Sequence, residues 1–125
     1  MNNYKERMKV PVSKGEYQLF IALKRAGLGD GIITQRKIQL REPDEAHPHG
    51  LVTTPDFLYP RRMLALYLDG NNVHRGYRLE RDEEIDELMK LKGWTVVRFP
   101  YHAPLSDKRK REIVEEVRRI RGRGK

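Results

Sequence analysis

Two acidic residues border apolar, strand-like segments of the chain, and together they could hold a divalent cation. Asp56 precedes the apolar run 57–59, and Asp69 ends the apolar run 64–68. Two carboxylates a few ångströms apart repel each other unless a cation or a proton lies between them. Mg²⁺ takes oxygen ligands and commonly binds one or two carboxylates together with water and substrate phosphate. The sequence therefore predicts a cation site where these two strands lie side by side.

Each candidate residue also has an ordinary structural explanation. Asp56 follows a proline and Asp69 precedes a glycine, and both pairs are common in turns. Glu16 stands three residues after Ser13, so a capping box at the start of a helix accounts for it completely. His74 has a side chain suited to proton transfer near neutral pH, but a single histidine in a loop is more often a surface residue. Taken one at a time, these residues leave both interpretations open.

A second polar cluster lies in the loop 41–50. Glu45, His47 and His49 fall within five residues and could bind a transition metal. The intervening Pro48 and the polar surroundings favour an ordinary surface loop instead.

The basic character of the chain is concentrated at its two ends. The net charge is +8, from 26 Lys and Arg against 18 Asp and Glu, and residues 15–106 carry equal numbers of each sign. We therefore expect a basic N-terminal arm at 1–12 and a basic C-terminal helix and tail at 106–125 that contact a polyanion. A merely solubilising tail is the alternative.

Part of the charge in the last helix should be neutralised internally. Lys108 with Glu112 and Arg111 with Glu115 have the spacing of ion pairs on one helix face. The remaining basic residues are the predicted phosphate contacts: Arg118, Arg119, Arg121, Arg123 and Lys125.

Apolar periodicity predicts one α/β domain over residues 1–125. We expect a helix from Ser13 to about residue 26, strands at about 32–40, 52–59 and 63–69, a helix at about 79–92, a strand at 94–99 and a last helix after 104–106. The second helix should bury Ile85, Leu88, Met89 and Leu91. The order αβββαβα predicts a mixed four-stranded sheet flanked by helices, with the third and fourth strands parallel in a right-handed βαβ unit.

Composition narrows the class of protein further. The chain has no cysteine, which excludes disulfides and thiolate zinc sites. We find no apolar run long enough to span a membrane and no signal-peptide pattern, so we expect a cytoplasmic protein with no membrane partner.

Taken in order, the candidate residues match a known pattern. The matching motifs are Glu16 on the first helix, Pro-Asp-Phe at 55–57, Asp69-Gly70 at a strand end, His74, Arg81-Asp82, and Gly93-Trp94 before the strand 96–99. Over residues 13–101 the chain resembles the PD-(D/E)XK nuclease superfamily. Within it, the chain is similar to the very-short-patch repair endonucleases and their small relatives. The resemblance implies a restriction-endonuclease-like fold.

The resemblance also implies roles for individual residues. Asp56 would be the principal metal ligand, the backbone carbonyl of Leu68 a second ligand, and Asp69 a further acidic residue at the metal. Glu16 would reach the metal through water, and His74 would act as general base or proton shuttle. Arg81 and Asp82 would support the site or touch backbone phosphate. The implied activity is metal-dependent DNA endonuclease, nicking or structure-specific, with Mg²⁺ or Mn²⁺.

Three departures from the superfamily pattern bear on that activity. Tyr67 and Asp69 stand where the motif has its second acid and its lysine. The repair enzymes carry a zinc held partly by cysteines, so no zinc is expected here. Asn72 and Val73 replace the aromatic wedge that opens a mismatch. A non-catalytic DNA- or RNA-binding module on the same scaffold is therefore the main alternative. An RNA-processing nuclease is a third, weaker alternative. Target structure and oligomeric state are left open by the sequence.

Overall fold

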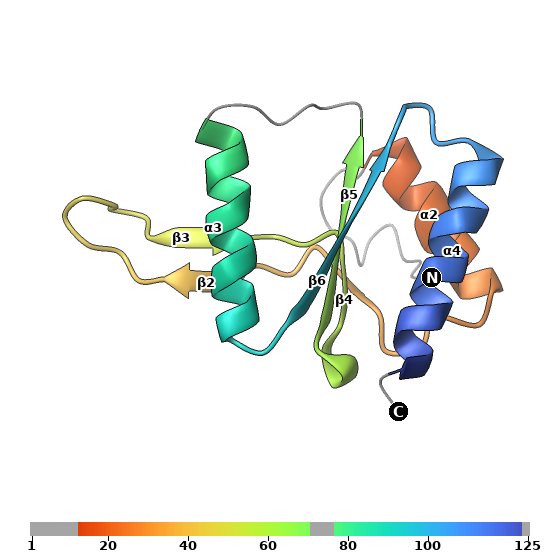
Figure 1. Ribbon diagram of the computed structural model, residues 1–125, viewed down its shortest axis with the longest axis horizontal. Helices are drawn as coiled ribbons and strands as arrows, with labels where there is room; N and C mark the ends of the chain where they lie inside the picture. The colour runs from red at the N-terminus through yellow and green to blue at the C-terminus, as the bar shows by residue number, and fades with distance from the viewer. Residues whose placement is uncertain (1–12, 71–76, 124–125) are drawn as a thin grey trace, which may run out of the picture.

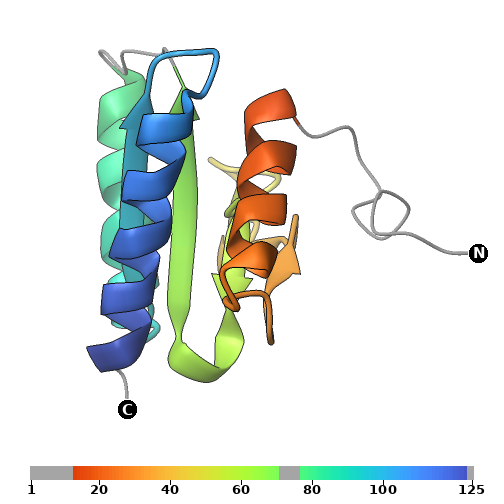
Figure 2. The ribbon, with the colours of Figure 1, turned by 90° about the vertical axis from the view of Figure 1, so that its right-hand side faces the viewer.

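A computed structural model describes residues 13–70 and 77–123. Its centre is a four-stranded sheet in the order β1-β4-β5-β6. Helices α2 (Lys14–Arg25) and α4 (Asp107–Arg123) cover one face, and α3 (Tyr77–Leu91) lies on the other beside a small two-stranded sheet (Figure 1). The view turned by 90° shows α4 beside α2 on their shared face (Figure 2). The predicted α/β class and mixed four-stranded sheet are confirmed.

The centre of the sheet is a hairpin followed by a parallel crossover. Strand β4 (Phe57–Tyr59) pairs antiparallel with β5 (Leu64–Gly70), and the short helix η1 (Pro60–Arg62) joins them. Proline presets the backbone angle that such a turn needs. Strand β5 then pairs in parallel with β6 (Thr95–Tyr101) along its whole length. The predicted hairpin and βαβ unit are therefore both present.

Two predicted strands are each broken in two, which corrects the expected element boundaries. The segment 32–40 divides into β1 (Ile33–Thr34) and β2 (Ile38–Arg41), because Gln35 between them takes a left-handed backbone conformation with φ 58°. The segment 52–59 divides into β3 (Leu51–Thr53) and β4 at Pro55, which has no N–H for a sheet. Strands β2 and β3 pair with each other as a separate ribbon.

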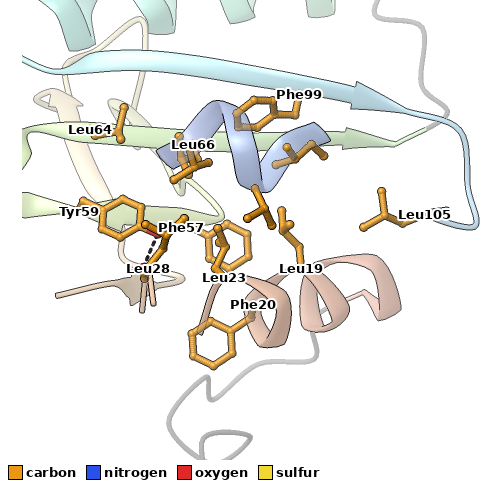
Figure 3. Packing of buried hydrophobic residues seen from close by; sticks show 13 residues of the cluster. Leu19, Phe20, Leu23, Leu28, Phe57, Tyr59, Leu64, Leu66, Phe99 and Leu105 are labelled. Carbon is orange, nitrogen blue, oxygen red and sulfur yellow. Dashed lines mark hydrogen bonds between the residues drawn. The ribbon is translucent and has the colours of Figure 1, made fainter. Parts of the chain in front are cut away.

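One apolar core lies between the sheet and helices α2 and α4. The apolar side of α2 carries Leu19 and Leu23, which pack with Phe57, Leu66 and residues of α4 (Figure 3). Ser13 and Glu16 form the predicted capping box at the start of this helix. The Tyr59 hydroxyl donates a hydrogen bond of 2.7 Å to the Leu28 carbonyl, so the one polar atom of a buried ring is satisfied.

A second core lies on the opposite face, under α3. Ile85 and Met89 are buried there against Ala65 and Tyr67 of β5. Leu91 was expected in this core, but its side chain is 83% exposed. At 3.6 residues per turn, position 91 lies about 120° around the helix from Ile85, so Leu91 points away from the core that buries Ile85.

Leu23 and Leu91, one buried and one exposed, allow the contribution of core packing to the free energy of unfolding to be measured. Leu23 is fully buried, so Leu23→Ala should lower the free energy of unfolding by about 2–5 kcal/mol through lost burial and a cavity. Leu91→Ala should change it by no more than about 0.5 kcal/mol. Urea denaturation of both variants checks the difference, and equal losses would contradict the packing described for α2.

Candidate functional site

Asp56 stands where β4 begins, and its side chain takes the place of a missing strand partner for β5. Its backbone N–H donates to the Leu66 carbonyl at 3.0 Å. Its Oδ2 atom accepts a hydrogen bond of 2.7 Å from the Leu68 N–H. The N–H and the C=O of one strand residue point to the same edge of the strand. The Leu68 carbonyl therefore faces the edge where Asp56 lies, beyond the last β4 partner.

Glu16 reaches Asp56 from the first turn of α2. Its backbone N–H donates to the Ser13 Oγ at 3.1 Å, and its Oε1 accepts from the Ser13 N–H at 3.4 Å. Its carboxyl group also shares a side-chain hydrogen bond with Asp56. The capping role and the proximity to Asp56 therefore coexist, because the cap fixes the position of the Glu16 side chain.

The electrostatics of Asp56 are unusual for a carboxyl group. Burial, followed by the hydrogen bond with Glu16 and the charges of Glu16 and Asp69, raises the pKa of Asp56 from 3.8 to about 8. The hydrogen bond from the Leu68 N–H works in the opposite direction. Near neutral pH a proton is therefore held at this site, where like charges would otherwise repel each other. We call Glu16, Asp56 and Asp69 the carboxylate site.

Asp69 has the smallest of these effects on the pKa of Asp56, and it also faces Arg98 of β6. The Arg98 Nη1 atom lies 3.8 Å from Asp69 Oδ1. The same guanidinium bonds Asp86 Oδ1 at 2.8 Å and lies 4.0 Å from Asp82 Oδ1. Burial works to lower the pKa of Arg98, but the hydrogen bond and charge of Asp86, with the charges of Asp82 and Asp69, raise it. Arg98 thus ties the end of β5 to α3.

Tyr67, at the position of the motif's second acid, is part of the core rather than of the carboxylate site. Its hydroxyl forms a buried hydrogen bond of 2.7 Å with the Thr53 hydroxyl. The Arg98 guanidinium carbon lies 4.2 Å from the centre of its ring, within cation–π range. Sequence reasoning did not assign Arg98 a role. The available signal was a single arginine inside the apolar segment 95–99.

Tyr101 closes the side of the carboxylate site between α2 and β5. A Cβ atom placed on Gly15 would lie 2.8 Å from the Tyr101 hydroxyl, and one on Gly70 would lie 2.6 Å from the same ring. Both distances are too short for a side chain. The two glycines adjoin Glu16 and Asp69, so the Tyr101 ring packs against the residues next to these two acids.

Two further expectations concern residues that could serve a metal. His74 lies outside the described residues. In the second polar cluster, His47 Nδ1 is 3.4 Å from Asp44 Oδ1 in an exposed loop.

Across residues 13–70 and 77–123, no three His, Cys, Asp or Glu side chains are grouped closely enough to hold a metal ion. The oxygens of Asp56, Glu16 and the Leu68 carbonyl nevertheless have the hard-donor chemistry that suits Mg²⁺, which takes its remaining ligands from water and phosphate.

The ion pairs of α4 correct the predicted pairing. Glu115 pairs with Arg118 at 3.7 Å and Glu116 pairs with Arg119, so these two arginines are not unpaired. Glu112 pairs with Arg109 at 3.1 Å rather than with Lys108. The observed pairs lie three residues apart, another spacing that brings side chains together on a helix.

The other predicted phosphate contacts are distributed unevenly. Arg81 is exposed on α3, and Arg121 is half-buried near the end of α4. Arg123 is the last helical residue, and Lys125 lies outside the described residues.

Comparison with known proteins gives no relative of this chain. No protein-family model matches the sequence, no curated protein is significantly similar to it, and no solved structure matches its fold. Among the described helices, none combines the length and apolar character needed to cross a membrane.

The raised pKa of Asp56 predicts a pH-dependent stability. Between about pH 4 and pH 8 the folded protein holds a proton that the unfolded chain has released, so the free energy of unfolding should fall as pH rises. The contribution is fully present below about pH 4 and lost above about pH 8. Urea denaturation in EDTA should show Asp56→Asn gaining stability over the wild type across this range. Asp44→Asn, in an exposed loop, is the control, and parallel curves for wild type and Asp56→Asn would contradict the assignment.

Arg98 should be important to stability, because its loss leaves Asp69, Asp82 and Asp86 facing one another. Its side chain is 21% exposed, so Arg98→Met should cost less than a fully buried pair, about 2–3 kcal/mol. Arg41, which pairs with Glu84 at 2.6 Å on the surface, is the comparison. Arg41→Met should cost under about 1 kcal/mol. Thermal or urea unfolding checks both, and a loss from Arg98→Met no larger than that from Arg41→Met would contradict the role given to Arg98.

Proposed function

We propose that this protein is a metal-dependent DNA endonuclease that hydrolyses phosphodiester bonds, with the carboxylate site as its active site. The observation that carries the proposal is the half-buried carboxyl group of Asp56, which accepts the Leu68 N–H and whose pKa is raised by burial and by the neighbouring Glu16 carboxyl. A site that holds a proton between close carboxyl groups is suited to exchange it for a cation. The motifs in 13–101 that resemble the PD-(D/E)XK nucleases include these same residues and support the proposal.

In this proposal the protein supplies oxygen ligands and a fixed geometry. A bound Mg²⁺ or Mn²⁺ would polarise the scissile phosphate and lower the pKa of the attacking water. Asp56 and the Leu68 carbonyl would bind the ion, and Glu16 would hold a water ligand from the helix cap. The Leu68 N–H orients the Asp56 carboxylate, as partners of metal ligands commonly do.

Asp69 and the basic residues have supporting roles in the proposal. Arg98 orients Asp69 at the end of β5, where it adds negative charge beside Asp56. His74 would accept or deliver the proton of the attacking water. Arg81, Arg118, Arg119, Arg121, Arg123 and Lys125 would contact backbone phosphates, which positions DNA without reading its sequence.

A second candidate function is a nucleic-acid-binding module without turnover. Two observations favour it: Tyr67 is locked in the core where the motif has an acid, and Asp69 already faces a cation in Arg98. Such a module would bind DNA or RNA through its basic residues and would have no affinity for a divalent cation at Asp56.

Cleavage of supercoiled plasmid separates the two candidates. With Mg²⁺ or Mn²⁺ the wild type should nick the plasmid, EDTA should stop the reaction, and Asp56→Asn should reduce it to background. Glu16→Gln should lower the rate by about 10- to 100-fold, the usual effect of altering a group that acts through a metal ligand. Asp44→Asn should leave the rate unchanged.

The same proteins should be tested for binding. Asp56→Asn should retain the gel shift of the wild type, because it removes no basic residue. Calorimetry should detect Mn²⁺ binding to the wild type and not to Asp56→Asn. DNA binding without cleavage or cation binding would overturn the nuclease proposal in favour of the binding module.

A further inference from the structure

A polar pocket lies at the opposite end of the sheet from the carboxylate site. It measures about 420 Å³ and is lined by Asp30, Gly31, Tyr59, Arg61, Arg62 and Arg121. Arg61 and Arg62 come from η1, at the tip of the β4–β5 hairpin, and Arg121 comes from the end of α4. Figure 1 shows this tip and the C-terminal end of α4 at the same end of the molecule. We call it the three-arginine pocket.

The three-arginine pocket is separate from the carboxylate site. Asp56 immediately precedes β4 and Pro60 immediately follows it. The two residues are therefore roughly 13 Å apart along the extended strand. A group bound among the arginines would therefore not be the one that meets Asp56.

The three arginines bring more positive charge together than the pocket balances. Asp30 is the one acidic residue among the lining residues. No ion pair within 4.0 Å joins it, or any other described carboxylate, to Arg61, Arg62 or Arg121. Like charges held together without a counter-ion repel one another. The arrangement of the three arginines therefore favours the binding of an anionic ligand.

Specific contacts hold two of the three arginines in place. Arg62 Nη1 donates a hydrogen bond of 2.9 Å to the Arg121 carbonyl, which joins the hairpin tip to the helix end. The Arg121 guanidinium carbon lies 4.9 Å from the centre of the Tyr59 ring, and that ring is fixed by its bond to Leu28. The Arg121 Nε atom is buried and has no hydrogen-bond partner among the described residues. A buried donor without a partner is costly, and a bound acceptor that draws the guanidinium toward it would remove the cost.

We propose that the three-arginine pocket binds a phosphate group. A phosphate monoester offers three acceptor oxygens and up to two negative charges, which match several guanidinium groups converging from two elements. Arg61 is exposed and forms no hydrogen bond or ion pair with other described residues, so its guanidinium group is available to a ligand. The source of the phosphate is free phosphate or a nucleic acid. The proposal does not depend on the nuclease activity.

Arg62 has a structural role as well, since a cation beside the last carbonyls of a helix stabilises that helix. A test that used Arg62 alone could confuse lost binding with lost folding. Arg61→Ala removes a pocket cation without removing a hydrogen bond or ion pair to the described residues. Arg62→Lys keeps the charge at the helix end and removes the planar guanidinium fork. Arg36→Ala removes the same charge from an exposed position outside the pocket and serves as the matched control.

Titration with inorganic phosphate at constant ionic strength tests the pocket directly. In ¹H–¹⁵N spectra, the Nε–Hε signals of Arg61, Arg62 and Arg121 should move together and saturate. Arg61→Ala should weaken binding by about tenfold or more, the effect of losing a charged hydrogen bond. Arg62→Lys should weaken it while leaving the melting temperature near that of the wild type, and Arg36→Ala should leave binding unchanged. Absence of saturation, or equal affinity in all four proteins, would overturn the proposal.

A second arm identifies the source of the phosphate. A duplex with 5′-phosphates that binds more tightly than the same duplex without them, in the wild type and not in Arg61→Ala, assigns a terminal phosphate. Equal binding of both duplexes, weakened by Arg61→Ala, assigns a backbone phosphodiester. Duplex binding unaffected by Arg61→Ala, with inorganic phosphate still bound, assigns free phosphate. Each result is independent of cleavage, so a failed pocket and a failed nuclease proposal can be told apart.

Discussion

The structure depends on strand β5, which is covered on both faces and hydrogen-bonded along both edges. A backbone N–H in the middle of a domain must find a partner. Strand β6 provides partners for the whole of one edge of β5, but β4 is short and its pairing ends opposite Leu66. At Leu68 the partner is the carboxylate of Asp56 instead. The candidate site therefore lies where pairing between strands ends and a side chain continues it.

The two ends of the sheet carry opposite electrostatic character. At the end of β5, the pKa of Asp56 is raised by burial, Glu16 and Asp69, so the site retains a proton. At the hairpin tip, Arg61, Arg62 and Arg121 gather around Tyr59 with one carboxylate nearby. Charged groups of one sign at each end attract ligands of the other sign. This charge distribution arises because the acidic residues lie at the end of β5 and the arginines lie at the β4–β5 turn and the end of α4.

Sequence reasoning found the features that depend on periodicity. Apolar periodicity located the helices and the central strands, and the parallel βαβ unit followed from chain order. It did not find the breaks at Gln35 and Pro55, because those depend on a backbone angle and on which strands pair. Arg98 was missed for a similar reason. The structural role of Arg98 depends on its ion pairs with Asp69, Asp82 and Asp86. These three residues lie on two other elements and come together only in the folded chain.

The contact of Tyr101 with Gly15 and Gly70 links three positions that are far apart in the sequence. A larger residue at either glycine needs a smaller one at position 101, and a smaller residue at 101 leaves a gap beside both. These three positions are therefore coupled, because a change at one alters the room at the others. A variant of this protein that has lost its glycines but kept the tyrosine would have to displace either the Tyr101 ring or α2. Displacement of α2 would take Glu16 away from Asp56.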